Sequence, residues 1–105
     1  MRWLAVVVMA VALGGCSDTP SGSTNPAAER GRQIYLAQCV SCHGPDPASA
    51  GPIGPPIKGT PPEVIESKVV RGTYPPGYKP KRPTAAMPPI AALAPDVPAL
   101  VEFLK

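Results

Sequence analysis

Large side chains are scarce in this chain, and their scarcity limits the core it can build. Aromatic residues make up 5% of the 105 residues, whereas proline and glycine number 17 and 10. A chain of this length forms one domain, and a small domain with so few large apolar groups struggles to offset the entropy lost on folding. Such domains depend on a disulfide, a metal or a cofactor. The sequence therefore predicts either a largely disordered chain or a domain with a hidden source of core.

Charge is sparse as well. Charged residues account for 16% of the chain and the formal net charge is +3. The basic residues are scattered and are not interleaved with aromatic ones, although single-stranded nucleic acid is bound by a cationic groove with stacking platforms. We therefore expect no nucleic-acid partner.

The chain also lacks an apolar run long enough to cross a bilayer. The run from Trp3 to Leu13 is well short of the roughly 20 residues that a transmembrane helix needs. A short positive start precedes it, and a run of this length is typical of a secretory signal. The sequence predicts export through the general secretory route, since no twin-arginine pair is present.

The residues after this run resemble a lipoprotein processing site. Leu13-Gly14-Gly15-Cys16 is similar to the bacterial lipobox, in which small residues precede a cysteine. The resemblance implies a signal peptide over 1–15 and a diacylated Cys16, followed by a flexible polar tether that ends at residue 26. A protein built this way is exported and lipid-anchored to a bacterial membrane, facing the periplasm or the cell exterior. The alternative is an ordinary signal with a cysteine nearby by chance.

Beyond the tether the pattern is helical, and no β-hairpin pattern appears. Apolar residues suited to helices occur over 27–38, 63–71 and 97–104, separated by loops dense in proline and glycine. Gly72 is a natural stop for the second helix, and Asp96 can cap the third. We expect an all-α domain over 27–105 with about three short helices and Pro/Gly-rich loops.

Cysteine and histidine are rare, yet they are clustered. Cys39, Cys42 and His43 form the pattern Cys-x-x-Cys-His, which is the attachment motif for c-type haem. Residues i and i+3 lie one helical turn apart on one face, so each thiol can add to one of the two vinyl groups on the porphyrin edge. His43 then points its imidazole at the iron. The motif predicts one covalent haem c, and the ring supplies the missing core.

Three other uses of these cysteines are weaker. A zinc site wants four Cys or His ligands, and the fourth here would be Cys16 on the tether. A thioredoxin-like dithiol expects a βαβ setting that the sequence lacks. A disulfide between Cys39 and Cys42 would close a trivially small loop and contribute little. One cysteine for lipid and two for haem leave none spare.

The second axial ligand is predicted separately. Met87 is the only methionine left once the signal is removed, and it stands in Met87-Pro88-Pro89 within a loop. A stiff proline-flanked backbone can hold its thioether in one pose, which favours ligation over simple core filling. The alternatives are an open position, a water, or a lysine such as Lys79.

From residue 31 to 105 the chain resembles class I cytochrome c, close to the small bacterial mono-haem domains. Gly31 and Tyr35 precede the attachment motif at the spacing of that family's first helix, and Leu100, Phe103 and Leu104 match its last helix. The resemblance implies that the two helices cross, with the glycine allowing close approach.

The same resemblance assigns further haem contacts. Gly54-Pro55-Pro56-Ile57 is similar to the family stretch in which a proline carbonyl accepts a hydrogen bond from the ligand histidine, which implies Pro55 here. Gly51-Pro52-Ile53 is a competing match. Met87-Pro88 matches the axial methionine and its following proline. No tryptophan remains after Trp3 to bind a haem propionate, so Tyr74 and Tyr78 are the candidates.

These residues predict an electron carrier rather than an enzyme. His43 is the only histidine and is used as a ligand, so no distal acid–base histidine remains. Redox proteins are the expected partners, and a basic cluster of Lys79, Lys81 and Arg82 could steer docking to an acidic surface. Two alternatives stay open: a fixed haem subunit of a larger membrane oxidoreductase, and a haem sensor or enzyme with an open sixth position.

Overall fold

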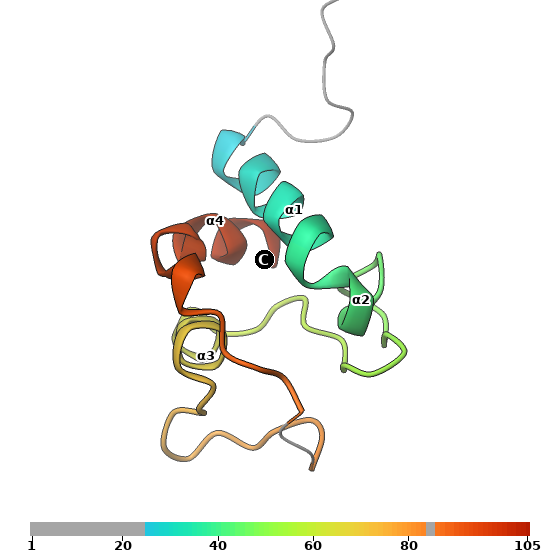
Figure 1. The fold of residues 1–105 in the computed structure, drawn as a ribbon, viewed down its shortest axis with the longest axis vertical. Coiled ribbons are helices and arrows are strands. Elements are labelled where there is room, and N and C mark those ends of the chain that lie inside the picture. The colour runs from blue at the N-terminus through green and yellow to red at the C-terminus, as the bar shows by residue number, and fades with distance from the viewer. Residues whose placement is uncertain (1–24, 84–85) are drawn as a thin grey trace, which may run out of the picture.

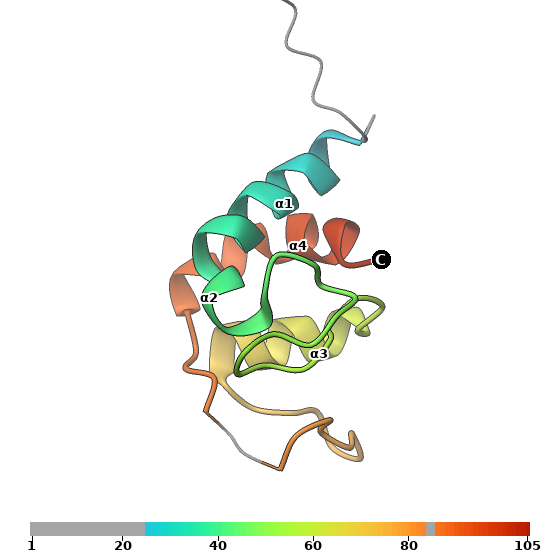
Figure 2. The same cartoon turned by 90° about the vertical axis from the view of Figure 1, so that its right-hand side faces the viewer.

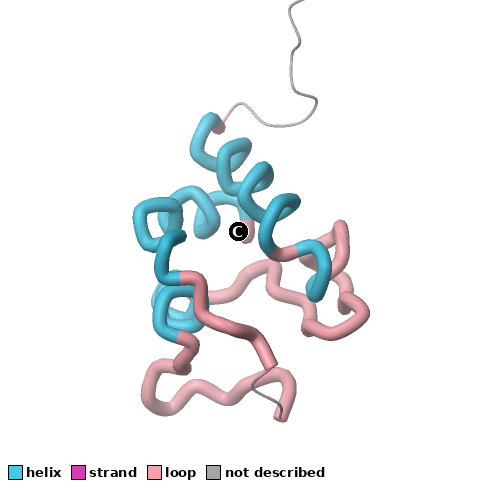
Figure 3. Tube along the Cα trace, viewed as in Figure 1, coloured by secondary structure: helices cyan, strands magenta, loops and turns pink. Residues whose placement is uncertain are grey.

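The computed structural model of the protein describes residues 25–83 and 86–105, and the regular structure within them is helical (Figures 1 and 3). In chain order the elements are α1 (Pro26–Gln38), α2 (Val40–His43), α3 (Pro62–Glu66), the π-helical η1 (Ser67–Arg71), the 3-10 helical η2 (Ala91–Asp96) and α4 (Val97–Phe103). The predicted signal over 1–15, the lipidated Cys16 and most of the tether lie outside these residues. Among the described helices, none has the length and apolar character that a membrane span requires.

Helix α1 begins one residue earlier than predicted because Asn25 caps it. The Asn25 side chain accepts hydrogen bonds from the amides of Ala27 and Ala28 at 3.0 and 3.4 Å. Pro26 occupies the first turn, where its missing N–H costs nothing, and Glu29 lies near the positive end of the helix. These local signals start the helix.

The crossing of α1 over α4 forms the upper part of the domain (Figures 1 and 2). A Cβ atom at Gly31 would run into the Ala99 carbonyl and lie 2.8 Å from the Phe103 Cβ. Only glycine therefore permits this approach, as the family resemblance implied. The core at the crossing is formed by five buried side chains: Tyr35, Ile65, Val97, Leu100 and Leu104. Tyr35 is fully buried, and its hydroxyl donates to the Gly44 carbonyl at 2.6 Å.

The predicted helix over 63–71 is present but changes its winding halfway. Its first part is α3, with Val64 and Ile65 buried, and it continues as the π-helical η1. Gly72 ends it in the left-handed region at φ 72°, as expected for a stop that favours glycine. The change to π-helical winding was not predicted. It coincides with a buried Ser67 and a buried Lys68.

The C-terminal helix begins at Val97. Pro98 lies in its first turn, where a proline removes no helical hydrogen bond. The expectation that Asp96 caps this helix was wrong. Asp96 is the last residue of η2 and already has near-helical backbone angles, φ −97° and ψ −3°, so its side chain makes no capping hydrogen bond. Its carboxylate instead accepts from the Arg30 guanidinium at 2.8 Å and joins α1 to this end of the domain. Short helices α2 and η2 add to the three predicted segments.

Candidate haem site

A cavity of about 270 Å³ lies between the helices and the proline-rich loops. Its walls come from α2, the stretch 53–57, α3 with η1, η2 with α4, and the described residues of the loop 72–90, which lie at the end of the domain away from α1 (Figures 1 and 2). Five buried apolar residues line it: Val64, Ile65, Leu93, Leu100 and Leu104. Much of the small core therefore faces this cavity.

Cys39, Cys42 and His43 are brought together at one wall of the cavity. Cys39 ends α1, and its carbonyl accepts from the amides of Cys42 and His43 at 3.3 and 2.9 Å, which winds the motif into α2. Both cysteines are half-buried free thiols. Burial raises the pKa of the Cys39 thiol, and the neighbouring Cys42 raises it further through a smaller electrostatic effect. The three predicted side chains thus line the same space, as the attachment chemistry requires.

The orientation of His43 is set by two short contacts. Its Nδ1 lies 3.0 Å from the Pro55 carbonyl oxygen, which fits an Nδ1–H that donates and leaves Nε2 free for a metal. A Cβ on Gly54 would lie within 3.0 Å of the imidazole, so only glycine leaves room for the ring. Of the two competing stretches, the structure therefore selects Gly54-Pro55. Gly51 packs against the backbone of Cys42 and His43 instead.

Met87 enters the cavity from the loop 72–90. It is half-buried and lines the same space as His43. The chain just beyond it is fixed, because the Ile90 amide donates to the Val69 carbonyl at 2.6 Å and Pro89 packs against Gly72. Lys79, the alternative ligand, is exposed and is not among the residues that line the cavity.

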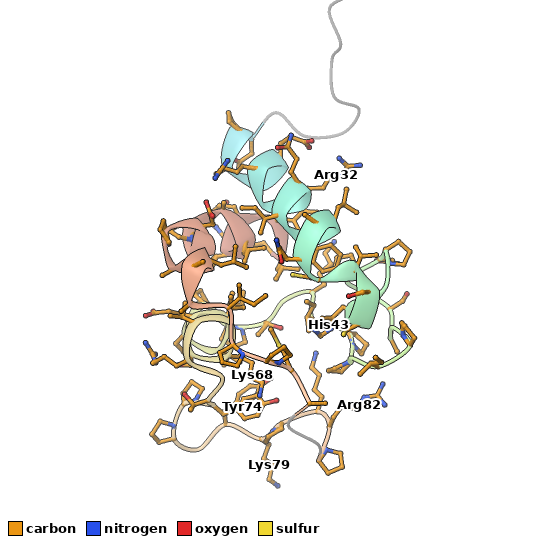
Figure 4. All side chains as sticks on the ribbon, viewed as in Figure 1. Arg32, His43, Lys68, Tyr74, Lys79 and Arg82 are labelled. Carbon is orange, nitrogen blue, oxygen red and sulfur yellow. The ribbon has the colours of Figure 1, made fainter. Side chains whose placement is uncertain are left out.

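Tyr74 and Tyr78 also line the cavity, and their rings stack with centroids 5.4 Å apart. The ammonium of Lys68 lies 4.4 Å from the centroid of the Tyr74 ring. Figure 4 shows His43, Lys68, Tyr74 and Arg82 around the lower half of the domain. Lys68 was missed by the sequence reasoning, although it stands three residues after Ile65 and four after Val64, on the buried face of the helix.

The predicted basic cluster divides into two parts. Lys81 reaches back to the Pro56 carbonyl at 2.6 Å, next to the peptide that contacts His43. Lys79 and Arg82 are exposed, and no ion pair within 25–83 and 86–105 involves either of them. Figure 4 shows both at the end of the domain opposite Arg32.

The residues present fit a haem c. In the described part of the chain, no three His, Cys, Asp or Glu side chains gather as a bare metal ion would require. The cavity is lined instead by two thiols and an imidazole from the attachment motif and by a thioether from another loop, and the rest of its wall is largely apolar. Those donors suit the vinyl groups, the iron and the apolar ring of a porphyrin.

The chain is similar to known cytochrome c proteins. Residues 26–104 match the family model described as cytochrome C oxidase, cbb3-type, subunit III. A solved structure of the c-type cytochrome NirC is 32% identical, with a TM-score of 0.49, and the match covers 72% of this chain and 85% of that one. A search of curated proteins found no match.

Proposed function

The chain belongs to the cytochrome c family named for cbb3-type oxidase subunit III, and from this premise we propose that it is a lipid-tethered electron carrier. Family membership makes it a c-type cytochrome with one covalent haem c, in an all-α cytochrome c fold. The proposal adds how it works: single electrons pass between redox partners outside the cytoplasm, with the haem held near a membrane.

One observation supports the carrier role above the others. Met87 lines the same cavity as Cys39, Cys42 and His43, although it lies on a separate loop. When bound, haem supplies a one-electron couple between ferric and ferrous iron. The imidazole of His43 and the thioether of Met87 would hold the iron of this haem, which would leave no position open to a substrate. A haem held in this way would exchange electrons without a change of protein ligand.

The surrounding residues tune that centre. The Met87 thioether favours the reduced state and raises the potential relative to two nitrogen ligands. The apolar walls exclude water and act in the same direction, since the oxidised centre carries one more positive charge. The Pro55 carbonyl acts oppositely, because its hydrogen bond makes His43 a stronger donor. We expect a clearly positive potential.

Localisation rests on the N-terminal sequence. We propose that Cys16 is diacylated, and two chains attach a protein to a bilayer more stably than one. The polar tether would then keep the haem within a few tens of Å of the surface.

Expression with the intact N-terminus in a host that attaches haem c tests both parts. We expect a reduced haem c spectrum in the membrane fraction, and the same spectrum in the soluble periplasmic fraction for Cys16→Ala exported behind a signal peptide that is removed without lipidation. Ser17→Ala is the matched control and should stay with the membrane. Colourless protein with two free thiols would reject the haem site, whereas coloured Cys16→Ala protein that remains on the membrane would reject only the lipid anchor.

We propose that Lys79 and Arg82 steer acidic partners toward the cavity mouth. Both are exposed and Arg82 lines the cavity, whereas the ammonium of Lys81 is held by Pro56. Lys79→Glu/Arg82→Glu should slow oxidation by anionic ferricyanide by on the order of tenfold at low salt, because steering raises association rates. Stopped-flow traces at rising salt should converge with wild type as the charges are screened.

Two comparisons make this docking test specific. Lys58→Glu/Arg32→Glu changes the net charge by the same amount, but at Lys58 and on α1 instead of at Lys79 and Arg82. The rate of its oxidation by ferricyanide should therefore stay near that of wild type. Cationic hexaammineruthenium should react faster with Lys79→Glu/Arg82→Glu than with wild type. Equal slowing by both charge-reversed pairs would mean that net charge, and no local surface, controls the rate.

A fixed subunit of a larger complex is the second candidate, because the family description itself names an oxidase subunit. A stoichiometric partner that co-purifies in mild detergent would support it. Protein that detergent extracts from the membrane without any partner, and that still exchanges electrons in solution, would support the free carrier.

A further inference from the structure

The loop 72–90 is fastened to the domain at its two ends. Near its start, the Thr73 amide donates to the Ser67 carbonyl at 3.2 Å, and at its end the Ile90 amide donates to the Val69 carbonyl at 2.6 Å. Both acceptors belong to η1, so one helix holds both ends of the loop. Whether the rest of the loop keeps its position therefore depends on contacts made by its middle.

Lys81 fastens the middle of this loop to a different part of the domain. Its Nζ donates to the Pro56 carbonyl oxygen at 2.6 Å, across 25 positions of the chain. The Tyr78 amide donates to the Pro75 carbonyl at 3.2 Å, but this bond stays inside the loop. Within the described residues, the bond from Lys81 is the only hydrogen bond that joins 74–83 to the rest of the domain.

The ring contacts of this loop do not replace that bond. The Tyr74 ring lies 4.4 Å from the Lys68 ammonium, but Tyr74 directly follows the end of the loop that Thr73 already holds. The Tyr78 ring stacks on Tyr74, which is itself part of the loop. Both contacts therefore secure the first part of the loop, and the part that leads to the axial methionine depends on Lys81.

The acceptor of this bond belongs to the stretch that orients His43. Pro56 follows Pro55, whose carbonyl oxygen lies 3.0 Å from the His43 Nδ1. Lys81 and Met87 stand six positions apart on the opposite loop, and all five of these residues line the haem cavity. The bond therefore joins the loop that carries one proposed iron ligand to the stretch that contacts the other.

We propose that Lys81 is a positioning residue, which holds the loop so that the Met87 sulfur stays at the haem iron. The proposal rests on the proposed function, in which Met87 is an axial ligand. The bond is exposed to solvent, so its contribution is modest. A modest contribution matters where the ligand is weakly held, and a thioether, which favours ferrous iron, is held less firmly by ferric iron. Loss of the bond should therefore show in the oxidised protein.

Imidazole binding to the oxidised holoprotein tests this role, because added imidazole reaches the iron when the thioether has left. Its apparent affinity reports the fraction of molecules in which the sulfur is detached. Lys81→Met keeps a long side chain but removes the donor. We expect it to bind imidazole about fivefold more tightly than wild type, as the loss of one exposed hydrogen bond would produce. Optical titration at about pH 8, where imidazole is largely uncharged, measures the affinity.

Two single variants provide matched comparisons. Lys81→Arg keeps a cationic donor and should return the imidazole affinity to near that of wild type. Lys58→Met removes one positive charge from an exposed residue two positions after Pro56, so it should leave the affinity unchanged. Lys81→Met should also retain the far-red band in the absence of imidazole, and hydrogen exchange in α1 and α4 should stay as in wild type, since the change is confined to the loop.

A double variant distinguishes positioning of the thioether from a general loosening of the cavity. Met87→Ala/Lys81→Met should bind imidazole with the same affinity as Met87→Ala, because no thioether remains to be held. A merely structural role for Lys81 would change the affinity in both backgrounds.

Several results would overturn the proposal. One is wild-type imidazole affinity in Lys81→Met. Another is equal tightening by Lys58→Met, which would show an effect of charge alone. A third is tighter binding by Met87→Ala/Lys81→Met than by Met87→Ala. Wild-type protein that binds imidazole as tightly as Met87→Ala would be a different outcome, since it would reject Met87 as a ligand and with it the proposed function.

Discussion

Cys39→Ala/Cys42→Ala should leave the chain largely unfolded. The five buried apolar residues that line the cavity would then face water, since no ring covers them. The helices compensate little, because α2, α3 and α4 have 4, 5 and 7 residues and α1 has 13, and isolated helices no longer than about 12–15 residues are marginal in water. We expect the far-ultraviolet circular dichroism signal for helix to fall by more than about half.

Ser41→Ala provides the control for this experiment. Ser41 lines the cavity but is exposed on α2 between the two cysteines, so its replacement leaves the attachment motif intact. The variant should keep the haem, the helix signal and a cooperative thermal transition. Native helix content in the double alanine variant would show that the polypeptide builds its own core, and the role given to the haem would be wrong.

Met87→Ala should have the largest effect on the redox properties. Loss of the thioether would open the sixth position, so the weak far-red sulfur-to-iron band of the oxidised form should vanish and the reduced form should bind carbon monoxide. The potential should fall by on the order of 0.1 V or more, within the roughly 0.8 V over which axial ligands move it. Optical titration measures both changes on the same sample.

Met87→His distinguishes the effect of changing the kind of ligand from the effect of losing a ligand. A second imidazole should keep the sixth position closed to carbon monoxide while the potential still falls, because nitrogen favours the oxidised state relative to sulfur. Wild-type protein that already binds carbon monoxide and lacks the far-red band would identify an open site and favour a sensor or enzyme. An unchanged spectrum in Met87→Ala would place the ligand elsewhere.

The fold class could be predicted because its signals are local. The motif ending at His43 specifies the cofactor, and Gly72 stops a helix at the predicted residue. Gly31 could be assigned from the family pattern, and the structure confirms that α4 leaves no room for a Cβ there. The placement of Met87 in the cavity was also expected, while its role as a ligand stays a prediction.

The other features could not be predicted because they depend on contacts between residues that are far apart in the sequence. Asp96 was expected to cap its own helix, but its partner Arg30 lies 66 positions earlier in the chain. Two stretches, at 51–53 and 54–57, matched the pattern for the histidine contact, and only the folded loop shows which carbonyl reaches His43. Lys68 was overlooked because a lysine is normally placed on the solvent side of a helix.

The crossing of α1 over α4 also constrains the order of folding. The partners of this contact, such as Gly31 and Ala99, come from opposite ends of the domain, and Asn25 donates to Glu102 across 77 positions. Helix α1 therefore cannot make this contact before the final helix is available. We expect the two thiols to stay accessible to the attachment machinery until α4 docks on α1.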